Sequence, residues 1–161
     1  MLLSELKTGH LNIKIFVLKL LVNNQDMFKP YAQFWMKSIC EFITGKQTGG
    51  KGIHYFIRDL CTLLVLWSDT YKPTDRAMCS KVINTLIRLA ADKSKIIFNI
   101  NIEILAMLMH KWRTMISIDK DMLVKMLQVP DQTDGSHLWK MTAIQMLALA
   151  CTFDIPISPV S

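Results

Sequence analysis

The sequence predicts an all-α protein, a HEAT/armadillo-like α-solenoid of about three helix pairs that forms a superhelical segment. Apolar residues recur at three- and four-residue steps nearly throughout, and no stretch alternates with period two for long enough to suggest a sheet. The breaks between helical stretches are centred near residues 26, 48, 71, 93 and 117. One helix and one turn every ~23 residues give a two-helix unit of about 46 residues, within the range of HEAT and armadillo repeats.

The first helices are predicted from the residues that separate them. A polar stretch, residues 23–26, ends the first helix, and Pro30 suits the first turn of the second, where a missing N–H costs nothing. The Gly-rich stretch 45–52 separates the second helix from the third, because four glycines among eight residues cannot hold a helix. We expect the second helix to bury one stripe of residues: Tyr31, Phe34, Trp35, Ile39, Phe42 and Ile43.

The later helices are bounded by acidic residues and prolines. Asp75 is placed to cap the fourth helix, and Asp119 and Asp121 lie in the first turn of the sixth, where carboxylates favour the positive end of the helix dipole. The seventh helix is expected to bury Leu138, Met141, Ile144, Leu147 and Cys151. In order, the predicted helices are residues 10–23, 30–44, 53–67, 75–91, 95–115, 119–128 and 137–153.

The chain is more apolar than a free-standing domain needs to be. Of its 161 residues, 51% are hydrophobic, and the mean hydropathy is +0.26. Helix pairs of a repeat protein bury their faces by stacking on the next pair. We therefore expect residues 1–161 to be a single helical-repeat segment of a longer solenoid, whose partners include the neighbouring repeats of the same chain.

Neither a membrane span nor a secretory signal is predicted. The apolar runs are far shorter than the about 20 residues that a spanning helix needs. The N-terminus lacks the basic region, the apolar region and the small-residue cleavage site of a signal peptide. We expect an intracellular protein that is not secreted and does not associate with a membrane.

The net charge of +6 and the pI near 9.2 favour an acidic partner. The excess is concentrated in residues 1–52, which carry seven lysines and three acidic residues. Scattered lysines of this kind most often line the solvated faces of amphipathic helices. The functional alternative is that they contact nucleic acid or an acidic protein, which makes these residues candidates: Lys7, Lys14, Lys19, Lys29, Lys37, Lys46 and Lys51.

No catalytic, cofactor-binding or metal site is predicted in this chain. The four cysteines (Cys40, Cys61, Cys79 and Cys151) lie singly in apolar segments, without the paired spacing of a zinc or thioredoxin-like site, and are interpreted as reduced core residues. His54 and Cys61 share a helix face, but two ligands do not make a metal site. The glycines of residues 49–52 lack the spacing of a phosphate-binding loop, and Asp119 and Asp121 point to different faces. The four tryptophans occupy expected core positions rather than a base-stacking platform.

Several stretches together closely resemble the family of the DNA-dependent protein kinase catalytic subunit. The resemblance begins with Thr8 to Gln25, which reads TGHLNIKIFVLKLLVNNQ, and continues with FKPYAQFW at residues 28–35. It extends through the glycines and the Ile-His-Tyr of residues 49–55 and reaches the C-terminal third at these positions: residues 101–104, Trp112, residues 117–118, residues 144–147 and the tail from Ile155. These stretches combine turns, aromatic residues and exposed polar residues that a generic repeat would not share.

This resemblance implies a segment of a very large nuclear serine/threonine kinase of the phosphatidylinositol-3-kinase-related group. The helical repeats of that family form a cradle that, with the Ku heterodimer, holds DNA ends for non-homologous end joining. The segment itself is expected not to be an enzyme, since it contains no G-x-G-x-x-G-x-V, H-R-D or D-F-G sequence. ATP and magnesium would belong to a kinase domain outside these residues.

Three other functions are weighed against this interpretation. A free-standing HEAT/armadillo-type protein-binding adaptor has the same periodicity, so only the resemblance distinguishes it. A small helical enzyme is disfavoured because no pair of titratable residues has a catalytic spacing. A sequence-specific DNA reader is disfavoured because no short turn leads into a recognition helix with Arg or Asn at successive outward positions.

Overall fold

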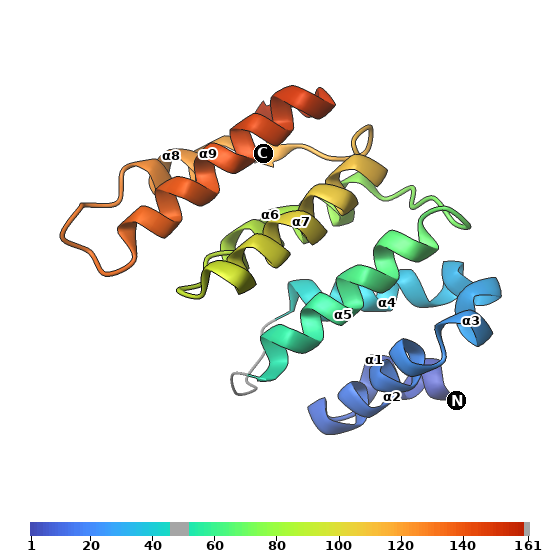
Figure 1. Ribbon diagram of the computed structural model, residues 1–161. Coiled ribbons are helices and arrows are strands. Elements are labelled where there is room, and N and C mark those ends of the chain that lie inside the picture. Colours follow the sequence, from blue (N-terminus) through green and yellow to red (C-terminus); the bar gives the residue numbers. More distant parts are fainter. Residues whose placement is uncertain (46–51, 160–161) are drawn as a thin grey trace. The chain divides into compact units, whose positions relative to one another are not determined.

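The computed structural model describes residues 1–45 and 52–159, with the side chains of the second range described from Tyr55 onward. The chain divides into two compact units, Met1–Thr74 and Asp75–Ser161. Helices make up nearly all the regular structure of the described residues (Figure 1). The predicted all-α class of a helical-repeat segment is confirmed.

The described part of the first unit is built from four longer helices, one short helix (α3) and a 3-10 turn. They are α1 (Leu2–Thr8), α2 (Leu11–Asn23), α3 (Gln25–Phe28), the 3-10 turn η1 (Lys29–Tyr31), α4 (Ala32–Thr44) and α5 (Gly52–Trp67). Helix α1 packs on α2 and α4, and α5 packs on both α2 and α4. The most deeply buried side chains of this unit come from α2, α4 and α5 and include Leu18, Leu21, Ile39, Leu60, Leu64 and Trp67.

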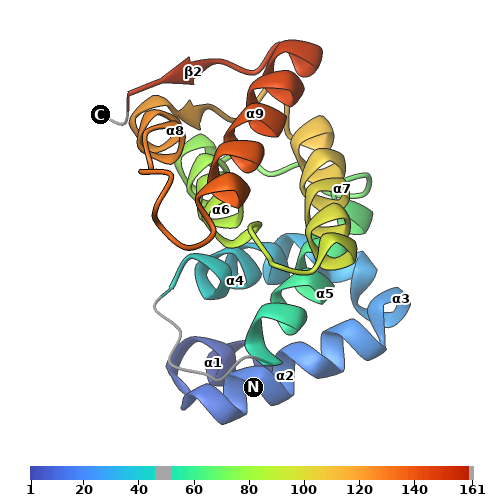
Figure 2. The same cartoon turned by 60° about the vertical axis from the view of Figure 1, so that its left-hand side comes forward.

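The second unit consists of two helix pairs and a short bridge between extended segments. Its elements are α6 (Arg76–Leu89), α7 (Lys95–Lys111), β1 (Ile118–Asp119), α8 (Lys120–Leu127), α9 (Ser136–Phe153) and β2 (Ile157–Ser158). Helix α6 packs on α7, and α9 packs on α7 and α8. After α9 the chain turns back, and β2 pairs in parallel with β1 through Ile118 opposite Ile157 (Figure 2). The core of this unit includes Val82, Ile83, Leu108, Met109, Trp112 and Met146.

Capping side chains fix two helix starts as predicted. The Asp75 carboxylate accepts a hydrogen bond from the Met78 N–H at 3.0 Å, and the Asp119 carboxylate accepts one from the Asp121 N–H at 3.0 Å. Pro30 lies in the 3-10 turn immediately before α4, where it removes no helical hydrogen bond.

Six of the seven predicted helices lie within two residues of the observed bounds at each end. The prediction of a helix over 95–115 is wrong at its end, because α7 stops at Lys111 and Trp112 leaves the helical conformation. The chain then extends so that Ile116 and Ile118 are buried beside α6. Two α6 side chains hold this extension: Ser80 accepts from the Ser117 N–H, and Asn84 accepts from the Asp119 N–H, both at 3.0 Å.

Helix α1 was not predicted, because the periodicity places the first helix at residues 10–23. Gly9 separates α1 from α2, with its N–H donating to the Glu5 carbonyl at 2.8 Å. A Cβ atom at this position would lie 2.4 Å from the same carbonyl oxygen. The break therefore needs glycine, and it allows a short helix of seven residues to pack beside α2.

Candidate interaction surface

Metal-binding side chains do not cluster in the described part of the chain. Among the side chains of residues 1–45 and 55–159, no group of three or more His, Cys, Asp and Glu could hold a metal ion. Burial raises the pKa of the Cys61 thiol to about 12, so this side chain stays protonated and unreactive. The pairing of His54 with Cys61 and the glycine loop before Gly52 lie outside the described side chains. The prediction that all four cysteines lie in the core is wrong for Cys151, which is exposed. Cys40, Cys61 and Cys79 are buried.

Five of the seven candidate lysines fall within the described residues, and Lys46 and Lys51 lie outside them. They are distributed over four elements of the first unit: Lys7 on α1, Lys14 and Lys19 on α2, Lys29 on η1 and Lys37 on α4. Lys14 is half-buried and the other four are exposed. In the described part of the chain, none of the five forms an ion pair, so their charges are available to a partner.

The structure does not bring these lysines into one cluster on a single element. Lys14 and Lys19 are five residues apart, which separates them by about 140° around α2. Lys29 and Lys37 instead lie on either side of a run of aromatic residues, and Lys7 follows Leu3 by one turn of α1. Lys7, Lys29 and Lys37 are therefore each close in sequence to residues that form one feature of the structure.

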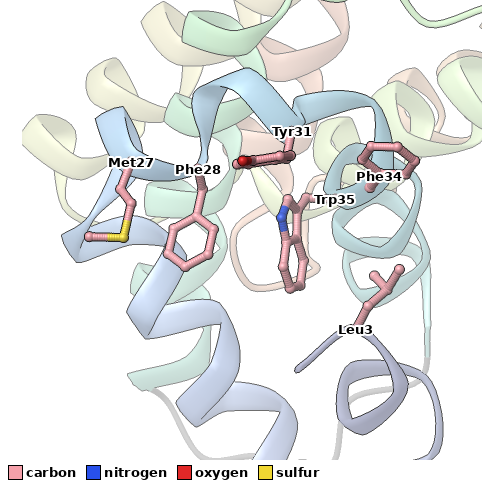
Figure 3. Close-up of a pocket in the computed structure, with 6 residues that line it drawn as sticks. All are labelled: Leu3, Met27, Phe28, Tyr31, Phe34 and Trp35. Atoms are coloured by element: carbon pink, nitrogen blue, oxygen red, sulfur yellow. The ribbon is translucent and has the colours of Figure 1, made fainter. Parts of the chain in front are cut away.

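That feature is an apolar pocket of about 350 Å³ in the first unit (Figure 3). We call it the aromatic pocket, and its lining residues are Leu3 of α1, Met27 and Phe28 of α3, Tyr31 of η1, and Phe34 and Trp35 of α4. The Phe28 and Trp35 rings meet edge to face, with centroids 5.6 Å apart. Met27 and Phe34 lie on the two sides of this ring pair in Figure 3, and Tyr31 lies beside Trp35. All the lining side chains are apolar or aromatic.

The buried stripe predicted for the second helix is wrong at two residues, Tyr31 and Phe34, both of which line the aromatic pocket. Trp35, Ile39, Phe42 and Ile43 are buried, but Tyr31 is 56% exposed and Phe34 is 55% exposed. Phe34 is one residue before Trp35 and so lies about 100° away from it around α4, whereas the small Ala32, three residues before Trp35, is on the buried side. Tyr31 precedes the helix in the 3-10 turn. Apolar spacing carried no signal for the exposure of these two residues, because periodicity does not show which apolar residues a neighbouring element covers.

Helix α9 also exposes a face that was predicted to be buried. Met141 is 44% exposed and Ile144 is 58% exposed, whereas Ala143 and Met146 are fully buried. The predicted stripe is therefore on the wrong side of the helix. The buried side is the one that carries Ala143 and Met146, and α9 packs on α7 and α8. Because α9 carries apolar residues on both sides, spacing alone does not determine which side is covered.

None of the helices in the described residues combines the length and the apolar character that crossing a membrane requires.

Comparisons with known proteins find similarity to the catalytic subunit of the DNA-dependent protein kinase. A family model described as "DNA-dependent protein kinase catalytic subunit, CC3" matches residues 2–73, which lie within the first compact unit. The curated catalytic subunit of the DNA-dependent protein kinase from Dictyostelium discoideum is 26% identical over 95% of the chain. The chain is similar to a segment of that protein. The predicted resemblance is thus confirmed.

Other DNA-dependent protein kinase catalytic subunits give the same result. Those of Gallus gallus and Xenopus laevis are 26% and 28% identical over 91% and 87% of the chain, so the similarity extends into the second unit. The chain spans only about 4% of the length of the curated relatives. These relatives are named as kinase subunits, and the similarity concerns a small piece of each.

Proposed function

We propose that the chain is a structural segment of a helical cradle that acts in DNA double-strand break repair by non-homologous end joining in the nucleus. The observation that carries this proposal is the similarity to the DNA-dependent protein kinase catalytic subunit over 95% of the chain. Packed helix pairs with apolar outward faces suit a segment whose work is to fix the curvature of a longer solenoid. In this proposal its partners are neighbouring repeats of the same chain, the Ku heterodimer and DNA ends.

The proposal assigns no reaction to these residues. Phosphoryl transfer would need a phosphate-binding loop, a metal-binding Asp and a catalytic Asp in one site. The sequence contains none of the corresponding kinase signatures. We therefore propose that the segment uses no cofactor and that ATP and magnesium bind elsewhere in a longer protein.

Gene replacement in the source cells tests the repair function. Cells that carry Leu60→Asp, which places a charge in the core of the first unit, should retain double-strand breaks after irradiation. The matched control is Asp59→Asn, which changes an exposed neighbour on the same helix and should leave repair normal. Normal repair in the Leu60→Asp cells would overturn the proposal. The length of the native transcript tests the cradle separately, because a solenoid segment requires a chain with many more helical repeats.

Lys7, Lys14, Lys19, Lys29 and Lys37, with Lys46 and Lys51, are the proposed contacts to DNA or an acidic partner. The proposal for these lysines is supported by their positive charge and by the absence of ion pairs among those that are described. The described lysines are also exposed, except for the half-buried Lys14. DNA affinity measured against salt should fall with a slope of about −0.9 per phosphate contacted. The double variant Lys7→Glu with Lys19→Glu should weaken binding and reduce that slope, whereas Lys125→Glu in the second unit should not. A salt-independent or absent signal would remove the DNA contacts.

The alternative function is a free-standing protein-binding adaptor, and the aromatic pocket is the observation that favours it. The two functions differ in the native protein. A complete chain that ends near Ser161 and leaves break repair unaffected when it is deleted would support the adaptor.

A further inference from the structure

The loop between α8 and α9 contains an Asp-Gly pair, Asp134 and Gly135, that the proposed function does not use. It is the single Asp-Gly pair of the sequence, which has no Asn-Gly pair. The loop covers residues 128–135 of the second unit and is drawn in orange in Figure 1. Residues 131–134 are all exposed, and the Asp134 side chain is 88% exposed. Water therefore reaches the Asp134 carboxyl group in the folded chain.

The backbone nitrogen of Gly135 is available to react. Within the described part of the chain its N–H donates no hydrogen bond. Its neighbours are paired, since the Thr133 N–H donates to the Pro130 carbonyl at 2.9 Å and the Ser136 N–H donates to the Thr133 carbonyl at 3.1 Å. Gly135 has a left-handed backbone with φ 75°, which glycine adopts without strain. The nitrogen next to Asp134 is thus neither bonded nor shielded by a Cβ atom.

The Asp134 carboxylate is held by an ion pair at the surface. Its oxygen lies 3.2 Å from the Lys93 Nζ, and Lys93 belongs to the loop between α6 and α7. The two side chains are 80% and 88% exposed, and ion pairs between such exposed groups contribute little. The ion pair therefore joins two loops of the second unit, but it leaves the carboxyl group able to turn toward its own backbone.

We propose that Asp134 is a site of spontaneous isomerisation to isoaspartate. The Gly135 nitrogen attacks the side-chain carbon Cγ of Asp134, and the new N–Cγ bond closes a five-membered succinimide ring. One carboxyl oxygen leaves as water, with the proton of the Gly135 amide and the proton of the protonated carboxyl group. The reacting atoms belong to adjacent residues, so the step is intramolecular and needs neither an enzyme nor a cofactor.

Water then opens the ring at one of its two carbonyl carbons. Attack at Cγ restores aspartate, whereas attack at the main-chain carbon leaves a main chain that runs through Cγ. The second product is isoaspartate, and the water lost in the first step is regained. No oxidant or reductant takes part, so the overall change is an isomerisation.

Isoaspartate at this position changes the junction before α9. It adds one methylene group to the main chain immediately before Gly135, the N-cap residue of α9, whose carbonyl accepts from the Leu138 N–H at 3.0 Å. The carboxylate becomes attached directly to Cα, which shortens its reach toward Lys93. We expect the contact between the two loops to loosen. This inference rests on the loop and not on the proposed repair function.

Asp131 provides an internal control in the same loop. Its side chain is 86% exposed and forms an ion pair with Lys140, but the next residue is Gln132 instead of glycine. The hydrogen bond from Lys140 also lowers the pKa of Asp131, which disfavours the protonated carboxyl group that reacts. Asp131 therefore controls for exposure, and variants at position 134 separate the contribution of the backbone from that of carboxyl ionisation.

Incubation of the folded chain at neutral pH in heavy-oxygen water tests the proposal. Each passage through the succinimide places one heavy oxygen atom in the residue, and mass spectrometry of the digested chain locates it. Asp134 should acquire the label at least about tenfold faster than Asp131 and should become a substrate for purified protein isoaspartyl methyltransferase. Equal labelling of the two aspartates, or labelling of Asp134 only after urea unfolds the chain, would overturn the proposal.

Two variants test the ring-closing step, with circular dichroism to check that each is folded. Asp134→Glu keeps the carboxylate but cannot form a five-membered ring, so both the label and the methylation should be lost. Asp134→Asn should lose ammonia several-fold faster than Asp134 loses water, because the amide does not ionise. The proposal would be refuted by methylation that persists in Asp134→Glu. It would also be refuted if Asp134→Asn lost ammonia no faster than Asn12, an exposed asparagine followed by Ile13.

Discussion

The four tryptophans show how differently single residues of one type contribute. Trp67 and Trp112 are each 1% exposed and Trp35 is 8% exposed, whereas Trp139, also predicted for the core, is only partly buried. A large ring that touches many neighbours in the interior cannot be removed without leaving a cavity. The buried tryptophans therefore carry much of the stability of their units.

Trp67→Ala should lower the free energy of unfolding by about 3–5 kcal/mol, because it removes a buried ring and leaves a cavity. Trp35→Ala should fall in the same range. Urea denaturation followed by circular dichroism measures both values. Phe16→Ala is the control, since a ring that is 61% exposed should change stability by no more than about 0.5 kcal/mol. Equal losses for Trp67→Ala and Phe16→Ala would show that Trp67 is not in the core.

Asn84 makes a different kind of residue-level contribution. Its amide accepts from the Asp119 N–H at 3.0 Å and donates to the Ser117 carbonyl at 3.3 Å, while the side chain is 8% exposed. Asn84→Leu should cost about 1–3 kcal/mol for each backbone group left without a partner. Thermal unfolding measures the loss, with Asn12→Leu on the exposed side of α2 as the control. Unchanged stability would mean that water replaces the amide.

Helices as whole elements could be predicted from the sequence far better than the faces they bury. Apolar periodicity located six helices within two residues, because spacing depends on local geometry. It did not predict which side of α9 is buried or that Tyr31 and Phe34 are exposed, because burial depends on which neighbour covers the helix. The aromatic pocket was missed for the same reason: Tyr31 and Phe34 have core-like chemistry, but no element of the first unit covers them.

Helix α9 offers a direct comparison between its two faces. Met146 is fully buried and Met141 is 44% exposed on the same helix. Met146→Ala should therefore destabilise the second unit by about 2–5 kcal/mol. Met141→Ala should change stability by no more than about 0.5 kcal/mol. Chemical denaturation of the two variants checks the assignment, and the reverse order would restore the face predicted from periodicity.

At the scale of the whole molecule, the division into two units coincides with the reach of the family model. The model matches residues 2–73, and the first unit ends at Thr74. Both units expose large apolar side chains, including Phe16 in the first, and Ile96 and Ile144 in the second. Such side chains are expected where helix pairs of a solenoid present faces to further repeats.

The purified chain should bind a hydrophobic dye while showing a strongly helical circular dichroism spectrum, because apolar faces are exposed on a folded protein. Replacing Phe16, Ile96 and Ile144 together by lysine should lower the dye fluorescence without changing the helical signal. The control replaces the exposed polar residues Asn12, Asn99 and Gln145 by lysine and should leave the fluorescence unchanged. Dye binding that is equal in the two triple variants would contradict this account of the surface.

The pairing of Ile118 with Ile157 gives the second unit a mechanical property that its helices alone would lack. An ordinary repeat array peels from its end one helix at a time, because each helix touches only its neighbours. Here the strand after α9 is fastened to the strand before α8, so a pull on the C-terminus meets the hydrogen bond from the Ile118 N–H to the Pro156 carbonyl before it reaches α9. Tension from that side is therefore directed toward α6, and α8 and α9 are held as a closed loop that yields only when the bridge breaks.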